Sequence, residues 1–179
     1  QCKASGRKHH YNNICVMLEE KVFKDTRFYP KVILGIENEA KINNYDTIIN
    51  FISKERYDIP LSIERGKVDG IIVIGHIDDE YLKMLKSFKI PIILVDYASM
   101  SVNTGAVLTQ NIPGAFKATE YLIKNGHRDI GFFGEIDAAM SFYERWLGFN
   151  MELKHYNIHV LTELCITENV EENALQNNY

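Results

Sequence analysis

Cysteine is scarce in this chain of 179 residues, and long apolar runs are absent from it. The three cysteines, Cys2, Cys15 and Cys165, are too few and too scattered for a disulfide framework or a cysteine metal site. Cys15 lies inside a short apolar run, where a free thiol packs as a small core residue. No apolar run approaches the roughly 20 residues that cross a bilayer. We therefore expect a cytoplasmic protein that makes no membrane contact.

A strong charge of one sign is also absent. The formal net charge is −4, and the isoelectric point is about 5.9. A domain that grips nucleic acid unaided is usually basic, so direct DNA contact by this segment is disfavoured. Only the start of the chain is basic, with Lys3, Arg7 and Lys8 and no acid among the first ten residues. This favours a linker over residues 1–12.

Motifs of catalysis and of cofactor binding are missing as well. Residues 131–134 lack both the GxGxxG pattern and a P-loop lysine, and no G-x-S-x-G, H-E-x-x-H or C-x-x-C occurs. His155 and His159 are four residues apart, as metal ligands on a helix would be. However, the helix is predicted to end near Asn157, and no third ligand is nearby. We expect no enzyme activity, no metal and no cofactor.

The chain contains short apolar runs that alternate with segments of helical periodicity. This alternation is typical of an α/β fold with a parallel sheet. The predicted strands cover residues 14–18, 47–52, 70–75, 91–96 and 106–109, and one more strand is predicted within 160–166, after the one near 130–134. Asp78 or Asp79 is expected to cap one helix, and Asn111 to cap the helix that stops at Gly126.

The predicted elements suggest three parts. Residues 1–12 form a hinge or linker, and 13–127 form a first subdomain. Residues 128–179 begin a second, similar subdomain, with a strand near 130–134 and a helix over 141–154. Because the last βα unit ends without a following strand, we expect this second subdomain to be cut short.

Several stretches, taken in order, carry a more specific signal. They are Ala4-Ser5-Gly6-Arg7, Val68-Asp69-Gly70-Ile71-Ile72, Ile90-Pro91 through Asp96, Gly114 through Phe132, and Ser141-Phe142-Tyr143-Glu144-Arg145 followed by Gly148-Phe149. Their order and spacing resemble the lac-repressor/gal-repressor (LacI/GalR) family of bacterial transcription regulators over roughly residues 5–176. Any one of these motifs would be weak, but together they are specific.

The resemblance implies a periplasmic-binding-protein-like fold, in which two flavodoxin-like subdomains close over a small effector. It also implies an upstream helix-turn-helix that reads operator DNA, and a homodimer formed through the core. The chain departs from the family pattern in places. No helix-turn-helix lies in these residues, Gln110 stands where the family usually has Asp, and Pro113 replaces a polar effector contact of some relatives.

Candidate effector-binding residues lie where strands end, because ligands of an open parallel sheet bind beyond its carboxyl ends. By resemblance, Phe28 and Tyr29 stack on the effector ring, although both could simply pack at a helix start. Asp96 ends the fourth strand and could accept hydrogen bonds from the effector or from a neighbouring backbone turn.

Two further candidates belong to the second subdomain. Arg145 stands in the R-x-x-G-F context of the family's effector-binding arginine, and its rigid fork of donors suits paired hydroxyls or a carboxylate. It could instead pair with Glu144 or Glu152. Ser141 could contact the effector or form a capping box with Glu144.

The sequence thus predicts the effector-binding core of a LacI-type repressor whose small-molecule effector is a sugar or a sugar derivative. The alternative is a solute-binding protein of a sugar transporter, which shares the two-lobed architecture. What precedes Gln1 would discriminate them, because a signal peptide favours transport.

Overall fold

The computed structural model describes residues 10–20, 28–53 and 56–168. By its internal contacts, the chain divides into two units, Gln1–Leu108 and Thr109–Tyr179. We describe each unit by itself, under the names unit 1 and unit 2.

Unit 1 contains a five-stranded, fully parallel sheet in the order β2-β1-β3-β4-β5. The strands are β1 (Asn13–Glu19), β2 (Asp46–Ile52), β3 (Gly70–Ile74), β4 (Ile92–Val95) and β5 (Gly105–Val107). The helices are α2 (Tyr29–Ile42), α3 (Leu61–Glu64) and α4 (Asp79–Ser87). The predicted α/β class, the parallel sheet and its five strands are confirmed, and the strand order is the flavodoxin-like one.

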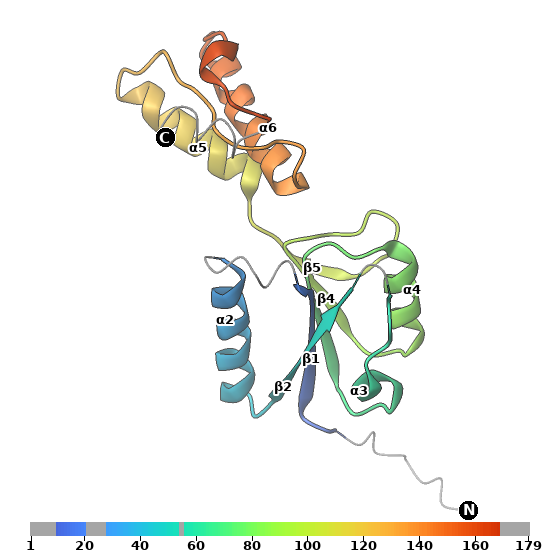
Figure 1. Ribbon diagram of the computed structural model, residues 1–179. Coiled ribbons are helices and arrows are strands. Elements are labelled where there is room, and N and C mark those ends of the chain that lie inside the picture. Colours follow the sequence, from blue (N-terminus) through green and yellow to red (C-terminus); the bar gives the residue numbers. More distant parts are fainter. Residues whose placement is uncertain (1–9, 21–27, 54–55, 169–179) are drawn as a thin grey trace, which may run out of the picture. The chain divides into compact units, whose positions relative to one another are not determined.

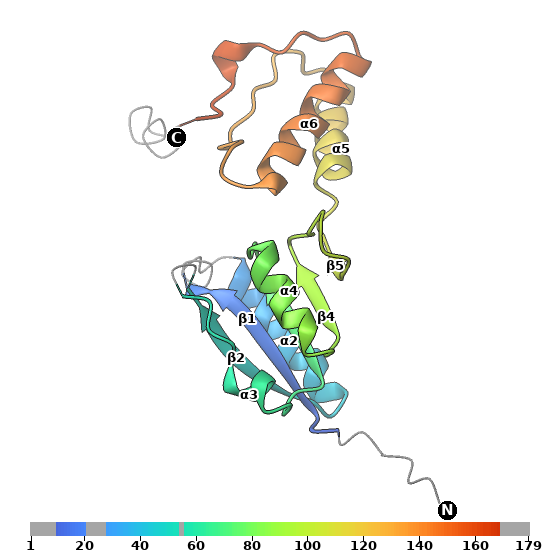
Figure 2. The ribbon, with the colours of Figure 1, turned by 90° about the vertical axis from the view of Figure 1, so that its right-hand side faces the viewer.

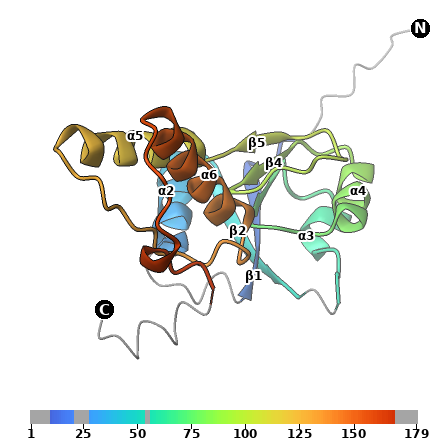
Figure 3. The same ribbon diagram turned by 90° about the horizontal axis from the view of Figure 1, so that it is seen from above.

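Helices cover both faces of this sheet. α2 lies on one face, whereas α3 and α4 lie on the other (Figures 1 and 3). Because successive strand side chains point to opposite faces, Val16 and Leu18 pack with Ile33 of α2. Cys15 and Met17 pack on the other side with residues of α3 and α4. A strand buried on both faces needs a continuous apolar run, which is why these strands were visible in the sequence.

Unit 2 is built around two helices that lie side by side, α5 (Asn111–Lys124) and α6 (Met140–His155) (Figures 1 and 2). Ile123 of α5 is buried together with Phe149 and Leu153 of α6. Because α5 packs on α6, it belongs to the second compact unit. The subdomain boundary expected near residues 126–128 therefore falls inside unit 2, after α5.

The two strands expected in unit 2 form only one contact. Phe133 and Ile166 make an isolated parallel bridge, and a short 3-10 helix, η1 (Thr162–Leu164), lies within the strand predicted over 160–166. The Ile166 amide donates to the Phe132 carbonyl at 2.8 Å, and the Gly134 amide donates to the Ile166 carbonyl at 3.0 Å. Two segments without flanking strands form too few ladder bonds for a sheet. The assignment of residues 128–179 to a second subdomain stays a prediction.

Within the described part of the chain, none of the helices combines the length and the apolar character that crossing a membrane requires.

Candidate functional site

The carboxyl edge of the unit 1 sheet brings together loops that are far apart in the sequence. The chain leaves β1 in one direction along the sheet and returns to β3 on its other side, so the strand order reverses between these two strands. Such a reversal is where open α/β sheets bind ligands. The Gly75 amide donates to the Val95 carbonyl at 2.9 Å, which carries the β3–β4 pairing beyond the end of β3. The loops after β3 and β4 therefore start side by side.

Tyr29 and Asp96 meet at this edge. The Tyr29 hydroxyl, in the first turn of α2, donates a 2.8 Å hydrogen bond to Asp96 Oδ2. Asp96 directly follows β4 and has a left-handed backbone with φ of 61°, which turns the chain sharply at the strand end. The partner of Asp96 is thus a side chain 67 residues away. Its second carboxylate oxygen can serve as an acceptor for a ligand hydroxyl.

Phe28 lies beside this pair. It occupies the position before α2, and its ring meets the Tyr29 ring edge-on, with centroids 5.0 Å apart. The Phe28 side chain is 45% exposed. An exposed aromatic ring beside a carboxylate suits a sugar, because the apolar face of the sugar stacks on the ring and its hydroxyls donate hydrogen bonds to the carboxylate. The structure therefore brings together Phe28, Tyr29 and Asp96, three of the five predicted residues.

The loop after β3 adds a residue that the sequence analysis missed. His76 is exposed, and its ring meets the Tyr97 ring at 4.7 Å with an interplanar angle of 68°. Gly75, with φ of 80°, makes the turn that precedes His76. The same rule that selected Asp96 applies here, because His76 is the second residue after a central strand. Only its lack of a motif kept it from being singled out.

Asp79 organises the adjoining loop after β4. The Ser99 hydroxyl donates to Asp79 at 2.6 Å, and the Ser101 hydroxyl donates to the other oxygen of the same carboxylate. The bonds from Ser101 and then Ser99 hold the pKa of Asp79 below its ordinary value. Burial and the nearby Asp79 carboxylate raise the pKa of Tyr97, so its phenol stays protonated. Asp78 stands at the N-cap of α4 without a capping bond from its side chain, so the predicted cap is not formed.

In unit 2, the two predicted caps are replaced by one contact between helices. α6 begins at Met140 with Ala139 at its N-cap, so Ser141 lies inside the helix and makes no capping box with Glu144. α5 begins at Asn111 itself, with no capping bond from a side chain. Instead, the buried Asn111 side chain donates to Glu144 Oε2 at 2.8 Å. Neither predicted cap is formed, because Asn111 bonds to Glu144 across the helix pair and Ser141 lies inside α6.

Arg145 is half-buried in α6, and its guanidinium carbon lies 5.3 Å from the centroid of the Phe142 ring. Neither expected ion pair is formed. Glu144 accepts from Asn111, and Glu152 is fully buried next to His155. Ser141 lies one turn before Arg145 on the same helix. The guanidinium of Arg145 therefore forms no ion pair with Glu144 or Glu152.

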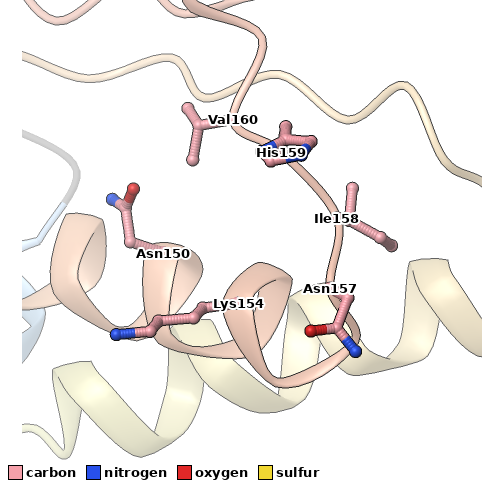
Figure 4. A pocket seen from close by; sticks show the side chains of 6 residues that line it. All are labelled: Asn150, Lys154, Asn157, Ile158, His159 and Val160. Atoms are coloured by element: carbon pink, nitrogen blue, oxygen red, sulfur yellow. The ribbon is translucent and has the colours of Figure 1, made fainter.

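A hollow of about 450 Å³ opens on unit 2 between the last turns of α6 and the segment that follows (Figure 4). It is lined by Asn150, Lys154, Asn157, Ile158, His159 and Val160. None of the five predicted effector residues lines it. His159 and His155 do not combine into a metal site, since the described residues contain no cluster of three or more side chains that could hold a metal ion.

Residues 11–178 match the family model described as periplasmic binding proteins and sugar-binding domain of LacI family. The chain is 29% identical over 151 residues to the HTH-type transcriptional repressor PurR of Pectobacterium carotovorum. That match covers 80% of this chain and 44% of the repressor, so the chain spans less than half the length of this relative.

Two solved structures have the same fold. A transcription regulator from Lactobacillus plantarum superposes with a TM-score of 0.73 at 24% identity, covering 91% of this chain and 60% of the regulator. A LacI family transcriptional regulator from Enterococcus faecium with bound ribose gives a TM-score of 0.68 at 24% identity. Here the match covers 87% of this chain and 56% of that protein.

Proposed function

Because the chain belongs to the family of periplasmic binding proteins and LacI-type sugar-binding domains, we propose that it is the effector-binding core of a transcription regulator. Its effector is a sugar or a close derivative. The relatives reported above are named as transcription regulators, and one of them holds ribose. The observation that carries the proposal is the Tyr29–Asp96 hydrogen bond beside exposed Phe28, at the edge of the sheet where this fold binds ligands.

Different residues of unit 1 are proposed to contact the apolar face and the hydroxyls of the sugar. Phe28 and Tyr29 offer aromatic surface to the apolar face of the ring, and Asp96 accepts hydrogen bonds from its hydroxyls. The bond from Tyr29 fixes the orientation of the carboxylate before the ligand arrives, which lowers the entropy cost of binding. Ser141 and Arg145, both on α6 of unit 2, are proposed as effector-binding residues from the family resemblance.

Regulation requires that the sugar bind one conformation of the protein more tightly than another. A ligand shifts an equilibrium only by its differential affinity for the two states, and coupling between two sites is typically about 1–3 kcal/mol. In this proposal the second site is a DNA-binding helix-turn-helix outside this segment. The protein is proposed to be a homodimer, because paired half-sites in an operator require a two-fold protein. As a DNA-binding regulator it acts in the cytoplasm, and we propose no enzymatic activity for it.

Calorimetric titration of the full-length gene product with ribose and a panel of neutral monosaccharides and disaccharides tests the proposal. Asp96→Asn and Arg145→Lys should each weaken binding by about tenfold or more, because each loses a charge-assisted or bidentate hydrogen bond. Arg56→Lys is the matched control. Arg56 is highly exposed and forms an ion pair with the exposed Asp58, so this exchange should leave affinity unchanged.

Failure of every sugar in the panel to bind would overturn the proposal. Sequencing the gene upstream of this segment tests the regulatory part separately. A helix-turn-helix of about 50–60 residues is expected there. A signal sequence would instead make a transporter's solute-binding protein the better account.

A further inference from the structure

We infer that Asp69 anchors the chain where it enters unit 1, and that this anchor couples the effector site to the part of the protein upstream of residue 10. The inference rests on the proposed function and deepens it, because it assigns the coupling between sugar and DNA to one side chain. Asp69 directly precedes β3, at the amino edge of the sheet. It is therefore a positioning residue, remote from the candidate effector site at the carboxyl edge.

The start of β1 is held from both sides by its neighbours in the sheet. On one side, the amide of Asp46, the first residue of β2, donates to the Asn12 carbonyl at 2.8 Å. On the other side, the Asp69 amide donates to the Asn13 carbonyl at 2.8 Å, and the Asn13 side chain donates to the Lys67 carbonyl at 3.0 Å. These bonds fix the entry of the chain into the sheet.

The Asp69 carboxylate extends this hold to the residues before the strand. Its Oδ2 accepts the Tyr11 amide at 2.9 Å and the Asn12 amide at 2.7 Å, and the His10 Nδ1 lies 3.7 Å from its Oδ1. Asn12 has a left-handed backbone with φ of 56°, so the chain turns there and two successive amides reach one oxygen. The Asp69 side chain is only 16% exposed, and hydrogen bonds to an ionised acceptor are roughly twice as strong as neutral ones.

An anchored entry must move together with unit 1. Asp69 precedes β3 and the amides that it binds precede β1, so the carboxylate joins the two central strands of the sheet. The same two strands end at the carboxyl edge, where the strand order reverses and the effector is proposed to bind. Without this carboxylate, rotation about the backbone dihedrals of residues 10–12 could absorb a displacement of unit 1. With it, a displacement caused by the effector reaches the upstream chain.

Hydrogen exchange of the full-length protein, followed by mass spectrometry, tests the anchor itself. Asp69→Ala should speed exchange of the Tyr11 and Asn12 amides by about tenfold or more, because each loses a bond to a charged acceptor. Asp69→Asn keeps one acceptor oxygen and should have a smaller effect. Asp46→Ala is the matched control, since Asp46 is an exposed acid at the same edge and its backbone amide still reaches the Asn12 carbonyl. It should leave both exchange rates unchanged.

The coupling is measured as the ratio of the DNA affinities with and without sugar. The sugar is the member of the panel above that the wild type binds most tightly, and the DNA is a duplex that the wild type selects from a random pool, with and without that sugar. A ratio of about 5–150 is typical of coupled sites, and Asp69→Ala should bring it to within about twofold of one. The affinity for the sugar itself, measured by calorimetry, should stay unchanged. Asp46→Ala should keep the wild-type ratio, and Asp69→Asn should keep part of it.

Three results would overturn the inference. Unaltered exchange in Asp69→Ala would show that the carboxylate does not hold the chain, and faster exchange with a wild-type ratio would show that the anchor carries no coupling. Weaker sugar binding together with a lower melting temperature would make Asp69 a general structural residue of unit 1. In all three cases the wild type still binds sugar and DNA, so the proposed function stands. If the wild type binds no sugar or selects no DNA, the proposed function fails and the inference fails with it.

Discussion

Gly148 lies where α6 comes close to the α5 backbone, and replacing it with alanine should destabilise unit 2. An ideal Cβ on Gly148 would lie 2.3 Å from the Ile112 carbonyl oxygen and 3.1 Å from the Ala115 Cβ. Both atoms belong to α5, and a helical carbonyl cannot rotate away as a flexible side chain can. Ordinary contact begins at 3.4 Å, so the helices must separate locally by 3.4 − 2.3 = 1.1 Å.

The expected loss in the free energy of unfolding follows from that separation of the helices. Moving α5 from α6 loosens the packing of Phe149 and Leu153 against Ile123. Overpacking of this kind costs about 1–3 kcal/mol, whereas alanine in a helix interior returns about 0.5–1 kcal/mol relative to glycine. We expect a net loss of about 1–2 kcal/mol in the free energy of unfolding. For a protein of about this size, the melting temperature should fall by roughly 2–8 °C.

Gly114→Ala is the matched control, since Gly114 lies in α5 and a Cβ there would meet nothing within 4 Å. This variant should be as stable as the wild type or more stable by up to about 1 kcal/mol. Denaturant and thermal unfolding of the three proteins, followed by circular dichroism, measure both effects. If Gly148→Ala proved as stable as Gly114→Ala, the close approach of the helices would be refuted.

Three more predictions concern single side chains. Glu152→Leu should raise the free energy of unfolding by about 1–3 kcal/mol, because Oε1 of this fully buried carboxylate has no hydrogen-bond partner among the described residues; a less stable variant in denaturant unfolding would contradict this. Burial raises the pKa of the Cys15 thiol to about 11, so native protein at about pH 8 should resist iodoacetamide at this residue until it is unfolded; peptide mass spectrometry reports the labelling, and equal labelling of native and unfolded chains would refute the burial. The pKa of Asp79 is lower in the folded chain than in the unfolded one, so its contribution to stability is present above about pH 4 and is lost as the pH falls through the folded value. Asp79→Asn should therefore flatten the acid side of the curve of melting temperature against pH, and an unaltered curve would count against the Ser99 and Ser101 bonds.

Local pattern was enough to predict the strands of unit 1. A strand buried on both faces must be apolar at every position, and the runs around Val16 and Val73 satisfy this without reference to any partner. The parallel sheet follows, because parallel strands require crossovers of a dozen or more residues and the helical stretches supply most of them. The expected strands in unit 2 failed, since a strand also needs neighbours that residues 130–134 and 160–166 do not find among the described residues.

The predicted helix caps were wrong, because spacing alone does not fix where a helix begins. Ser141 and Glu144 have the spacing of a capping box, yet α6 starts one residue before Ser141. Glu144 bonds to Asn111, which is 33 residues away and was itself expected to be a cap. A cap depends on which residue begins the helix and on which partners compete for the side chain. Both are set by the packing of α5 on α6, so no local pattern can decide them.

The sequence by itself determined the α/β class, the strands of unit 1 and the loops in which candidate ligand residues stand, because each of these follows from patterns within a few residues. Only the tertiary structure decided that Tyr29 bonds to Asp96 and that His76 leaves the same edge of the sheet. It also decided that α5 belongs with α6. These are pairings between residues tens of positions apart, and their free energy depends on the strand order and on the packing of the whole unit.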